Sequence, residues 1–66
     1  MITYEPFWRT IKEKQISQYD LILKYKMSRS LLDKLRHNKS ITMLTLNDIC
    51  TMFDCSVSDV IEFKKE

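Results

Sequence analysis

The chain has 66 residues, a formal net charge of +2, 44% hydrophobic residues and 30% charged residues, a composition that is ordinary for one globular domain and argues against a disordered chain. It contains no glycine, which excludes the phosphate-binding loops of nucleotide-binding proteins, because those loops need glycine to bring the backbone close to the ligand. No apolar run approaches the ~20 residues that cross a bilayer, and residues 1–10 lack the pattern of a secretion signal, so we expect a single domain over residues 1–66 in the cytoplasm.

Charge is unevenly distributed along the chain. Residues 24–39 carry six basic residues against Asp33 alone, a net charge of +5, whereas residues 40–66 carry a net charge of −3. The basic residues are Lys24, Lys26, Arg29, Lys34, Arg36 and Lys39. A basic segment flanked by neutral and acidic ones indicates a surface for a polyanion. The alternative is a solvated helix face that is basic without a partner.

The spacing of apolar residues predicts an all-α chain of five short helices. Pro6 suits the first turn of a helix over residues 6–14, where its missing N–H costs nothing, and we expect Phe7 and Trp8 to lie in the core. Ser17 is a good N-cap for a second helix over residues 18–25.

The third, fourth and fifth helices follow in the second half of the chain. Ser28 is an N-cap for a helix over residues 29–37, and Asn38 tolerates the left-handed conformation that commonly ends a helix. Residues 39–44 are expected to form a loop, after which Thr45 caps a helix over residues 46–53. Ser56 and Asp59 match a capping box that opens the fifth helix. No segment alternates apolar and polar residues for long enough to predict a sheet.

The second and third predicted helices carry the most informative pattern. A connection of only two or three residues between them makes the helices cross steeply, as in a helix-turn-helix unit. Leu21 and Tyr25 lie on the inner face of the second helix, Met27 fills the turn, and Leu32 and Leu35 lie on the inner face of the third.

With these residues in place, the chain resembles the phage-repressor and Cro-like (XRE-type) helix-turn-helix family, whose members have a lambda-repressor-like fold. The resemblance covers residues 7–63, and its second half is similar to a small stand-alone subgroup of that family. The residues that carry it are Ser17, Gln18, Leu21, Met27, Ser28, Leu32, Leu35, Thr45, Leu46, Ile49, Cys50, Phe53, Cys55, Asp59, Val60 and Ile61.

The resemblance implies five helices with the third in the major groove of DNA, and a dimeric regulator of transcription, in many members a repressor. Three positions depart from the family pattern. Ile22 stands where a small residue is usual, Lys26 where glycine is usual, and Arg36 where an acidic residue is usual. Lys26 therefore implies a strained or differently shaped turn.

The residues themselves support duplex DNA as the partner. An α-helix fits the major groove, and its N-terminal residues reach base edges. If Leu31, Leu32 and Leu35 pack inward, six candidate base-contacting residues point outward: Ser28, Arg29, Ser30, Asp33, Lys34 and His37. Arg29 is the best base reader among them, because its guanidinium can bond guanine at two points. Four residues flanking this helix are candidate phosphate contacts: Gln18, Lys39, Ser40 and Thr42.

We expect the DNA-binding protein to be a homodimer, with Ile61 and Phe63 as its interface.

The alternative function is a protein-binding module of the same fold, an antitoxin or adaptor acting through the fifth helix. Cys50 and Cys55 are expected to be reduced thiols, and with His37 they are too few for a closed zinc site. We expect no enzyme activity, cofactor, metal, membrane partner or small-molecule substrate, since 66 residues scarcely enclose a catalytic pocket.

Overall fold

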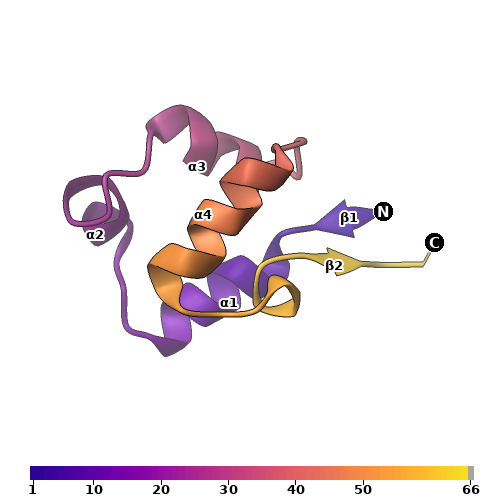
Figure 1. Cartoon of the computed structure of the whole chain (residues 1–66), viewed down its shortest axis with the longest axis horizontal. Helices are drawn as coiled ribbons and strands as arrows, with labels where there is room; N and C mark the ends of the chain where they lie inside the picture. The colour runs from indigo at the N-terminus through magenta and orange to yellow at the C-terminus, as the bar shows by residue number, and fades with distance from the viewer. Residues whose placement is uncertain (66) are drawn as a thin grey trace.

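The computed structural model describes residues 1–65, which form α-helices around a small core and a short sheet at one end (Figure 1). In chain order the elements are β1 (Ile2–Thr3), α1 (Glu5–Glu13), α2 (Gln18–Leu23), α3 (Arg29–Arg36), α4 (Met43–Phe53), the 3-10 turn η1 (Val57–Asp59) and β2 (Glu62–Phe63). β1 and β2 pair antiparallel, with Ile2 opposite Phe63 and Thr3 opposite Glu62. The two ends of the chain therefore lie side by side. No helix within residues 1–65 is long and apolar enough to cross a membrane.

Side chains of serine and threonine begin three of the four helices. The Ser17 hydroxyl accepts a hydrogen bond from Asp20 N at 3.0 Å, and the Asp20 carboxylate accepts one from Ser17 N. The N–H groups of Ser17 and Asp20, which have no partner within the helix, are therefore both hydrogen-bonded. The Ser28 hydroxyl accepts from Leu31 N at 3.0 Å. The predicted caps Ser17 and Ser28 are confirmed, and Pro6 lies in the first turn of α1 as expected.

Three helices end in the same way, with a left-handed residue that is not glycine. Gln15, Asn38 and Asp54 have φ angles of 58°, 55° and 50°, and each is followed by an N–H that reaches back five residues to a carbonyl in the last turn of its helix. Lys39 N, for example, bonds Lys34 O at 2.9 Å. This is the Schellman arrangement, in which orphaned carbonyls at the helix end find a donor. The prediction for Asn38 is confirmed.

The core is made of side chains from all four helices together with Tyr4, Met27 and Val60. Phe7 is 1% exposed and packs edge-on against Trp8 and Phe53, with ring centroids 4.9 and 5.9 Å apart. Trp8 is half-buried, and its Nε1 donates to Leu35 O at 3.2 Å. That bond ties α1 to α3. Phe7 and Trp8 therefore serve the packing role expected of them.

The C-terminal quarter corrects the five-helix prediction. The expected fifth helix is the single turn η1, and the following residues form β2 instead of a continued helix. The Asp59 carboxylate does accept from Ser56 N at 3.0 Å, so the predicted capping interaction exists. It starts a turn that stops at Val60, whose carbonyl accepts from Phe7 N at 3.2 Å in α1. The antitoxin or adaptor alternative assumed a fifth helix, and up to residue 65 this stretch holds only the turn η1 and the strand β2.

Helix bounds also differ from the prediction in two places. α2 ends at Leu23 instead of residue 25. α4 begins at Met43, three residues early, because Thr42 is the cap: its hydroxyl accepts from Thr45 N at 3.0 Å and donates to the Thr45 hydroxyl. Residues 43 and 44 therefore belong to the first turn of α4 and not to the expected loop.

Candidate nucleic-acid interface

The connection between α2 and α3 is built around two buried contacts and one strained residue. It runs over residues 24–28, longer than expected because α2 ends early. Met27 is 4% exposed, and its N–H donates to Leu21 O at 2.9 Å. Lys26 precedes it with a φ angle of 56°, so of the two possibilities for this turn, strained or differently shaped, the structure has the strained, left-handed one. The connection therefore turns the chain sharply and holds the start of α3 against α2.

The exposed residues of α3 and its two capping residues include every residue predicted to contact bases. Leu32 and Leu35 are each 1% exposed, and Leu31 is half-buried, so the helix is oriented as the sequence predicts. The six candidate base-contacting residues are all exposed: Ser28, Arg29, Ser30, Asp33, Lys34 and His37. Ser28 already uses its hydroxyl to cap the helix, so it has less hydrogen-bonding capacity to offer a base.

Asp33 and His37 contact each other across one turn of α3. Nδ1 of His37 lies 3.1 Å from the Asp33 carboxylate and 2.9 Å from the Asp33 carbonyl oxygen. Sequence analysis treated the two side chains as independent. The pair fixes their orientation near the C-terminal end of the face, away from the first turn that carries Arg29.

A hollow between α2 and α3 brings part of the predicted site together. Gln18 at the start of α2 lines it together with Arg29, Ser30 and Asp33 of α3. A residue predicted to contact phosphate thus lies beside three predicted to contact bases. Ile22, which replaces the usual small residue, also lines this hollow and is half-buried.

The remaining predicted phosphate contacts follow the C-terminal end of α3. Lys39 is exposed in the loop after α3, and Ser40 and Thr42 line a different hollow near the start of α4. Thr42 is engaged in capping α4. The predicted contacts therefore flank α3 on two sides and do not form one cluster.

Tyr4 holds the loop after α3 in place, a role that sequence analysis missed. Its hydroxyl donates to Lys39 O at 2.6 Å, and its N–H donates to the Asn38 side-chain oxygen at 3.2 Å. Burial raises the pKa of the Tyr4 hydroxyl, which stays protonated and able to donate. No local sequence signal links Tyr4 to residue 39, because the contact spans 35 positions.

Arg36 is a second residue that was not predicted to contact DNA, although it belongs to the basic segment and departs from the family pattern. Its guanidinium lies 5.5 Å from the centre of the Trp8 ring, and it lines the same hollow as Gln18 and Arg29. Seven positions separate it from Arg29, which is two helical turns and hence the same face. That spacing could have identified it.

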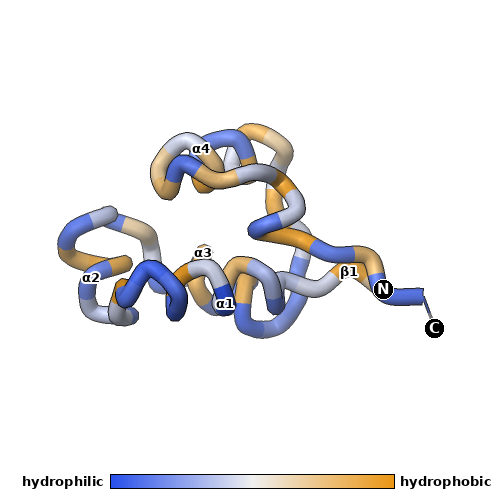
Figure 2. The backbone as a smooth tube through the Cα atoms, turned by 90° about the horizontal axis from the view of Figure 1, so that it is seen from below, coloured by the Kyte–Doolittle hydropathy of each residue, from blue (hydrophilic) through white to orange (hydrophobic). Residues whose placement is uncertain are grey.

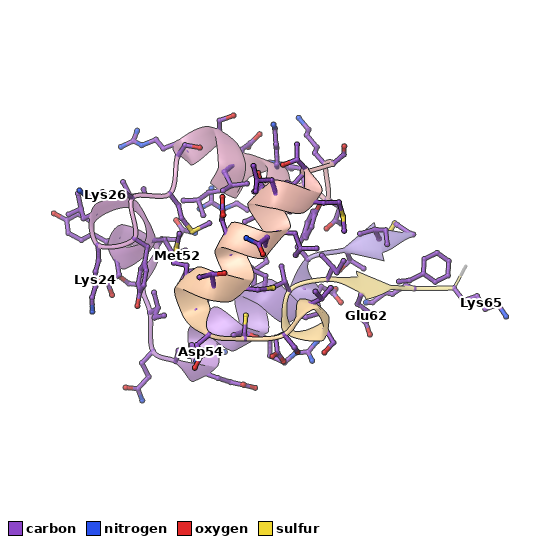
Figure 3. The ribbon with its side chains drawn as sticks, in the orientation of Figure 1. Lys24, Lys26, Met52, Asp54, Glu62 and Lys65 are labelled. Atoms are coloured by element: carbon purple, nitrogen blue, oxygen red, sulfur yellow. The ribbon has the colours of Figure 1, made fainter. Side chains whose placement is uncertain are left out.

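The basic and acidic parts of the chain lie on different sides of the molecule. α2 and α3 lie on one side, and α4 lies on the other (Figure 2). Lys24 and Lys26 extend from the end of the molecule that carries α2, whereas Asp54 caps the C-terminal end of α4 and Glu62 lies in β2 (Figure 3). The surface around α2 and α3 is therefore the one suited to a polyanion.

The two cysteines are free thiols, as expected. Cys50 and Cys55 are both half-buried, and burial raises the pKa of the Cys55 thiol, which disfavours the thiolate that binds metals. Over residues 1–65 no three His, Cys, Asp or Glu side chains gather as metal ligands would.

Comparison with known proteins places this architecture among DNA-binding domains. The family model of the Cro/C1-type HTH DNA-binding domain matches residues 7–66. The crystal structure of transcriptional regulator VanUg, form II, is similar with a TM-score of 0.84 at 25% sequence identity, over 98% of this chain and 87% of that one. No curated protein matches the chain. Both similarities include the candidate interface formed by α2 and α3.

Proposed function

Since the chain belongs to the family of Cro/C1-type HTH DNA-binding domains, we propose that it is a sequence-specific, duplex-DNA-binding regulator of transcription in which α3 enters the major groove. The observation that carries this proposal is the exposed face of α3, where polar and basic side chains line one side of a helix whose leucines are buried. An α-helix presented in this way fits the major groove, and its first turn lies nearest the bases.

Arg29 and Ser30 are the proposed base readers. Both belong to the first turn of α3 and line the hollow beside α2. The guanidinium of Arg29 can donate two hydrogen bonds to guanine, and the Ser30 hydroxyl can donate or accept. Lys34 lies one turn further and reads bases or anchors phosphate according to the depth of docking. Asp33 and His37, held as a pair, are proposed to contact bases at the edge of the site.

The residues around α3 are proposed to hold the DNA backbone. Gln18 lies at the start of α2, where the helix dipole favours a phosphate. Lys39, Ser40 and Thr42 follow α3, and Tyr4 fixes the backbone of this loop. Arg36 joins this set, because it is basic and lines the same hollow as Gln18. Contacts of this kind fix register and carry no sequence information.

The working form on DNA is proposed to be a symmetric homodimer, with Ile61 and Phe63 in its interface. One domain of this size makes few base contacts, and pairing two half-sites about 10 base pairs apart doubles them. Phe63 is 68% exposed at the end of β2, and Ile61 is half-buried, which leaves the Phe63 ring available for a partner.

Alanine variants at readers and anchors test this assignment. A preferred site is first selected from random duplex, and affinity is then measured on that site and on a scrambled duplex. Arg29→Ala should lose about 1–3 kcal/mol on the selected site and relax the preference at one base pair. Lys39→Ala should weaken both duplexes alike, because a phosphate contact is indifferent to sequence.

Two results would contradict the assignment in different ways. If Arg29→Ala lost the same affinity for both duplexes, Arg29 would not contact a base specifically, and the proposed docking of α3 would be wrong. If small, equal losses followed every substitution on α3, the basic face would be only a solvated surface.

A further inference from the structure

The imidazole of His37 is held against Asp33 at the C-terminal end of α3. Nδ1 of His37 lies 2.9 Å from the Asp33 carbonyl oxygen and 3.1 Å from the Asp33 carboxylate. A carbonyl oxygen and an ionised carboxylate only accept hydrogen bonds. In the neutral ring the hydrogen therefore lies on Nδ1, and Nε2 is left bare, because the hydrogen bond made by one ring nitrogen sets the state of the other.

Within residues 1–65 the imidazole is hydrogen-bonded or ion-paired with Asp33 alone. The nearest charged neighbours of His37 in the sequence are Arg36 and Lys39. The guanidinium of Arg36 lies over the Trp8 ring, and Tyr4 donates its hydroxyl hydrogen to the Lys39 carbonyl oxygen in the loop that follows. The side chain of His37 is 61% exposed, so Nε2 is open to a group outside the protein.

His37 lies on the same side of α3 as Ser30, one of the two proposed base readers. Seven residues separate the two, which is two helical turns and about 10 Å along the helix axis. Both are exposed, whereas Leu32 and Leu35 between them are buried. If α3 lies along the major groove, His37 therefore reaches a base pair about three steps from the one beside Ser30.

We propose that the neutral His37 determines sequence specificity: its bare Nε2 accepts a hydrogen bond from the amino group of adenine or cytosine, and Asp33 is the positioning residue that fixes the tautomer. This inference rests on the proposed binding of α3 to DNA. In the major groove, adenine and cytosine present an amino donor, whereas guanine and thymine present a carbonyl acceptor. A ring with its hydrogen on Nε2 would have the opposite preference, so the contact with Asp33 decides which bases His37 recognises.

A bare Nε2 supplies an acceptor that the basic side chains of α3 lack. Arg29 and Lys34 only donate hydrogen bonds, so they match the acceptors of guanine and of phosphate. The amino group of a base needs an acceptor, and an unpaired carboxylate in this place would be repelled by the DNA backbone. With its carboxylate paired to Nδ1, Asp33 makes the uncharged ring of His37 the acceptor instead.

The tautomer is measured first, without DNA. A long-range 1H–15N correlation spectrum at about pH 8.5, where an ordinary imidazole is neutral, distinguishes a protonated ring nitrogen from a bare one. The chain has one histidine, so its signals need no assignment. The wild type should carry the hydrogen on Nδ1. Asp33→Ala keeps the backbone acceptor and removes the carboxylate, so the share of the tautomer with hydrogen on Nε2 should rise. Hydrogen on Nε2 in the wild type overturns the proposal.

Base preference is then measured at the same pH on a site selected from random duplex. The wild type should prefer adenine or cytosine at one position, and exchange to guanine or thymine there should weaken binding about tenfold. His37→Ala should abolish that preference and keep the guanine preference of Arg29. Lys39→Ala is the matched control beside the same end of α3, and it should keep both preferences.

Protonation of the ring tests the sign of the contact. At about pH 5.5 an ordinary imidazole carries hydrogen on both nitrogens, so the preference for adenine or cytosine should fall while the guanine preference of Arg29 persists. An affinity that rose alike for every duplex, with the preference at this position unchanged, would mark a phosphate contact and overturn the proposal. If His37→Ala kept every base preference at about pH 8.5, this inference alone would fail, whereas a wild type that bound no duplex would overturn the proposed function itself.

Discussion

Lys26 occupies a left-handed backbone conformation, with a φ angle of 56°, in the turn between α2 and α3. A residue with a Cβ atom pays for that conformation through a clash with the following carbonyl oxygen, and glycine does not. Lys26→Gly should therefore raise the free energy of unfolding by about 1 kcal/mol. The same variant removes a positive charge beside α3, so affinity for DNA should fall while stability rises. Chemical denaturation and a DNA titration measure the two effects.

Lys24→Gly is the matched control for this prediction. Lys24 carries the same charge in the same turn, but its φ and ψ angles of −83° and −44° are right-handed. Glycine there gains nothing in the folded state and costs about 1 kcal/mol through the entropy of the unfolded chain. If both variants lost stability equally, strain at Lys26 would not be the reason for the effect.

At the scale of elements, the C-terminal turn depends on an ionised carboxylate. The N–H of Ser56, and then its hydroxyl, donate to Asp59 and hold the pKa of that carboxyl below its ordinary value of 3.8. The hydrogen bond from Lys64 similarly lowers the pKa of Glu5. This contact ties the residue after β2 to the start of α1. Both carboxyls bind protons more weakly in the folded protein than in the unfolded chain. Their stabilisation is complete above the ordinary values and is lost as pH falls through the folded ones.

Asp59→Asn should flatten the acid limb of the stability profile. The free energy of unfolding of the wild type should decline as pH falls below about 4. The free energy of unfolding of the variant should be lower than that of the wild type at pH 6 and should decline less as pH falls. Glu5→Gln should act in the same direction through the contact with Lys64. Urea denaturation between pH 3 and pH 6 is the measurement, and parallel profiles for wild type and variants would count against these two carboxyls.

Helix starts and the helix-turn-helix unit could be predicted because their signals are local. Ser17, Ser28 and Asn38 each act within a few residues, and the three leucines of α3 follow the helical repeat. Thr42 and Thr45 show the limit of that reasoning. Both residues are good caps, but the exposed Met43 and Leu44 between them break the apolar pattern of α4. The pattern therefore predicted Thr45 as the cap, whereas Thr42 caps the helix.

The sheet could not be predicted because nothing local announces it. Ile2 and Phe63 are 61 positions apart, and each strand has only two residues, too few to show alternation. The same holds for Tyr4 and the loop after α3. The candidate site was predicted as a set of exposed residues on one helix. Its grouping into a hollow shared by Gln18, Arg29 and Arg36 depends on how α2 packs against α3.

At the scale of the whole molecule, basic and acidic residues belong to different segments of the chain. The +5 segment over residues 24–39 contains α3 and the turn before it, and the −3 segment over residues 40–66 contains α4 and β2. If the net charge of +2 were spread evenly over the surface, no side of the molecule would attract a polyanion more than another. Binding to a polyanion should therefore depend on where a charge lies and not only on how many there are.

The most direct test is the salt dependence of affinity for duplex DNA, compared between Lys34→Glu and Lys65→Glu. The two variants change net charge equally, but Lys34 lies on α3 and Lys65 follows β2. If about four phosphates are neutralised per subunit, log affinity of the wild type should fall against log salt with a slope near −4. Lys34→Glu should bind weakly with a shallower slope, and Lys65→Glu should behave like the wild type. A salt-independent affinity, or equal losses in both variants, would contradict the assignment of α3 as the DNA-binding element.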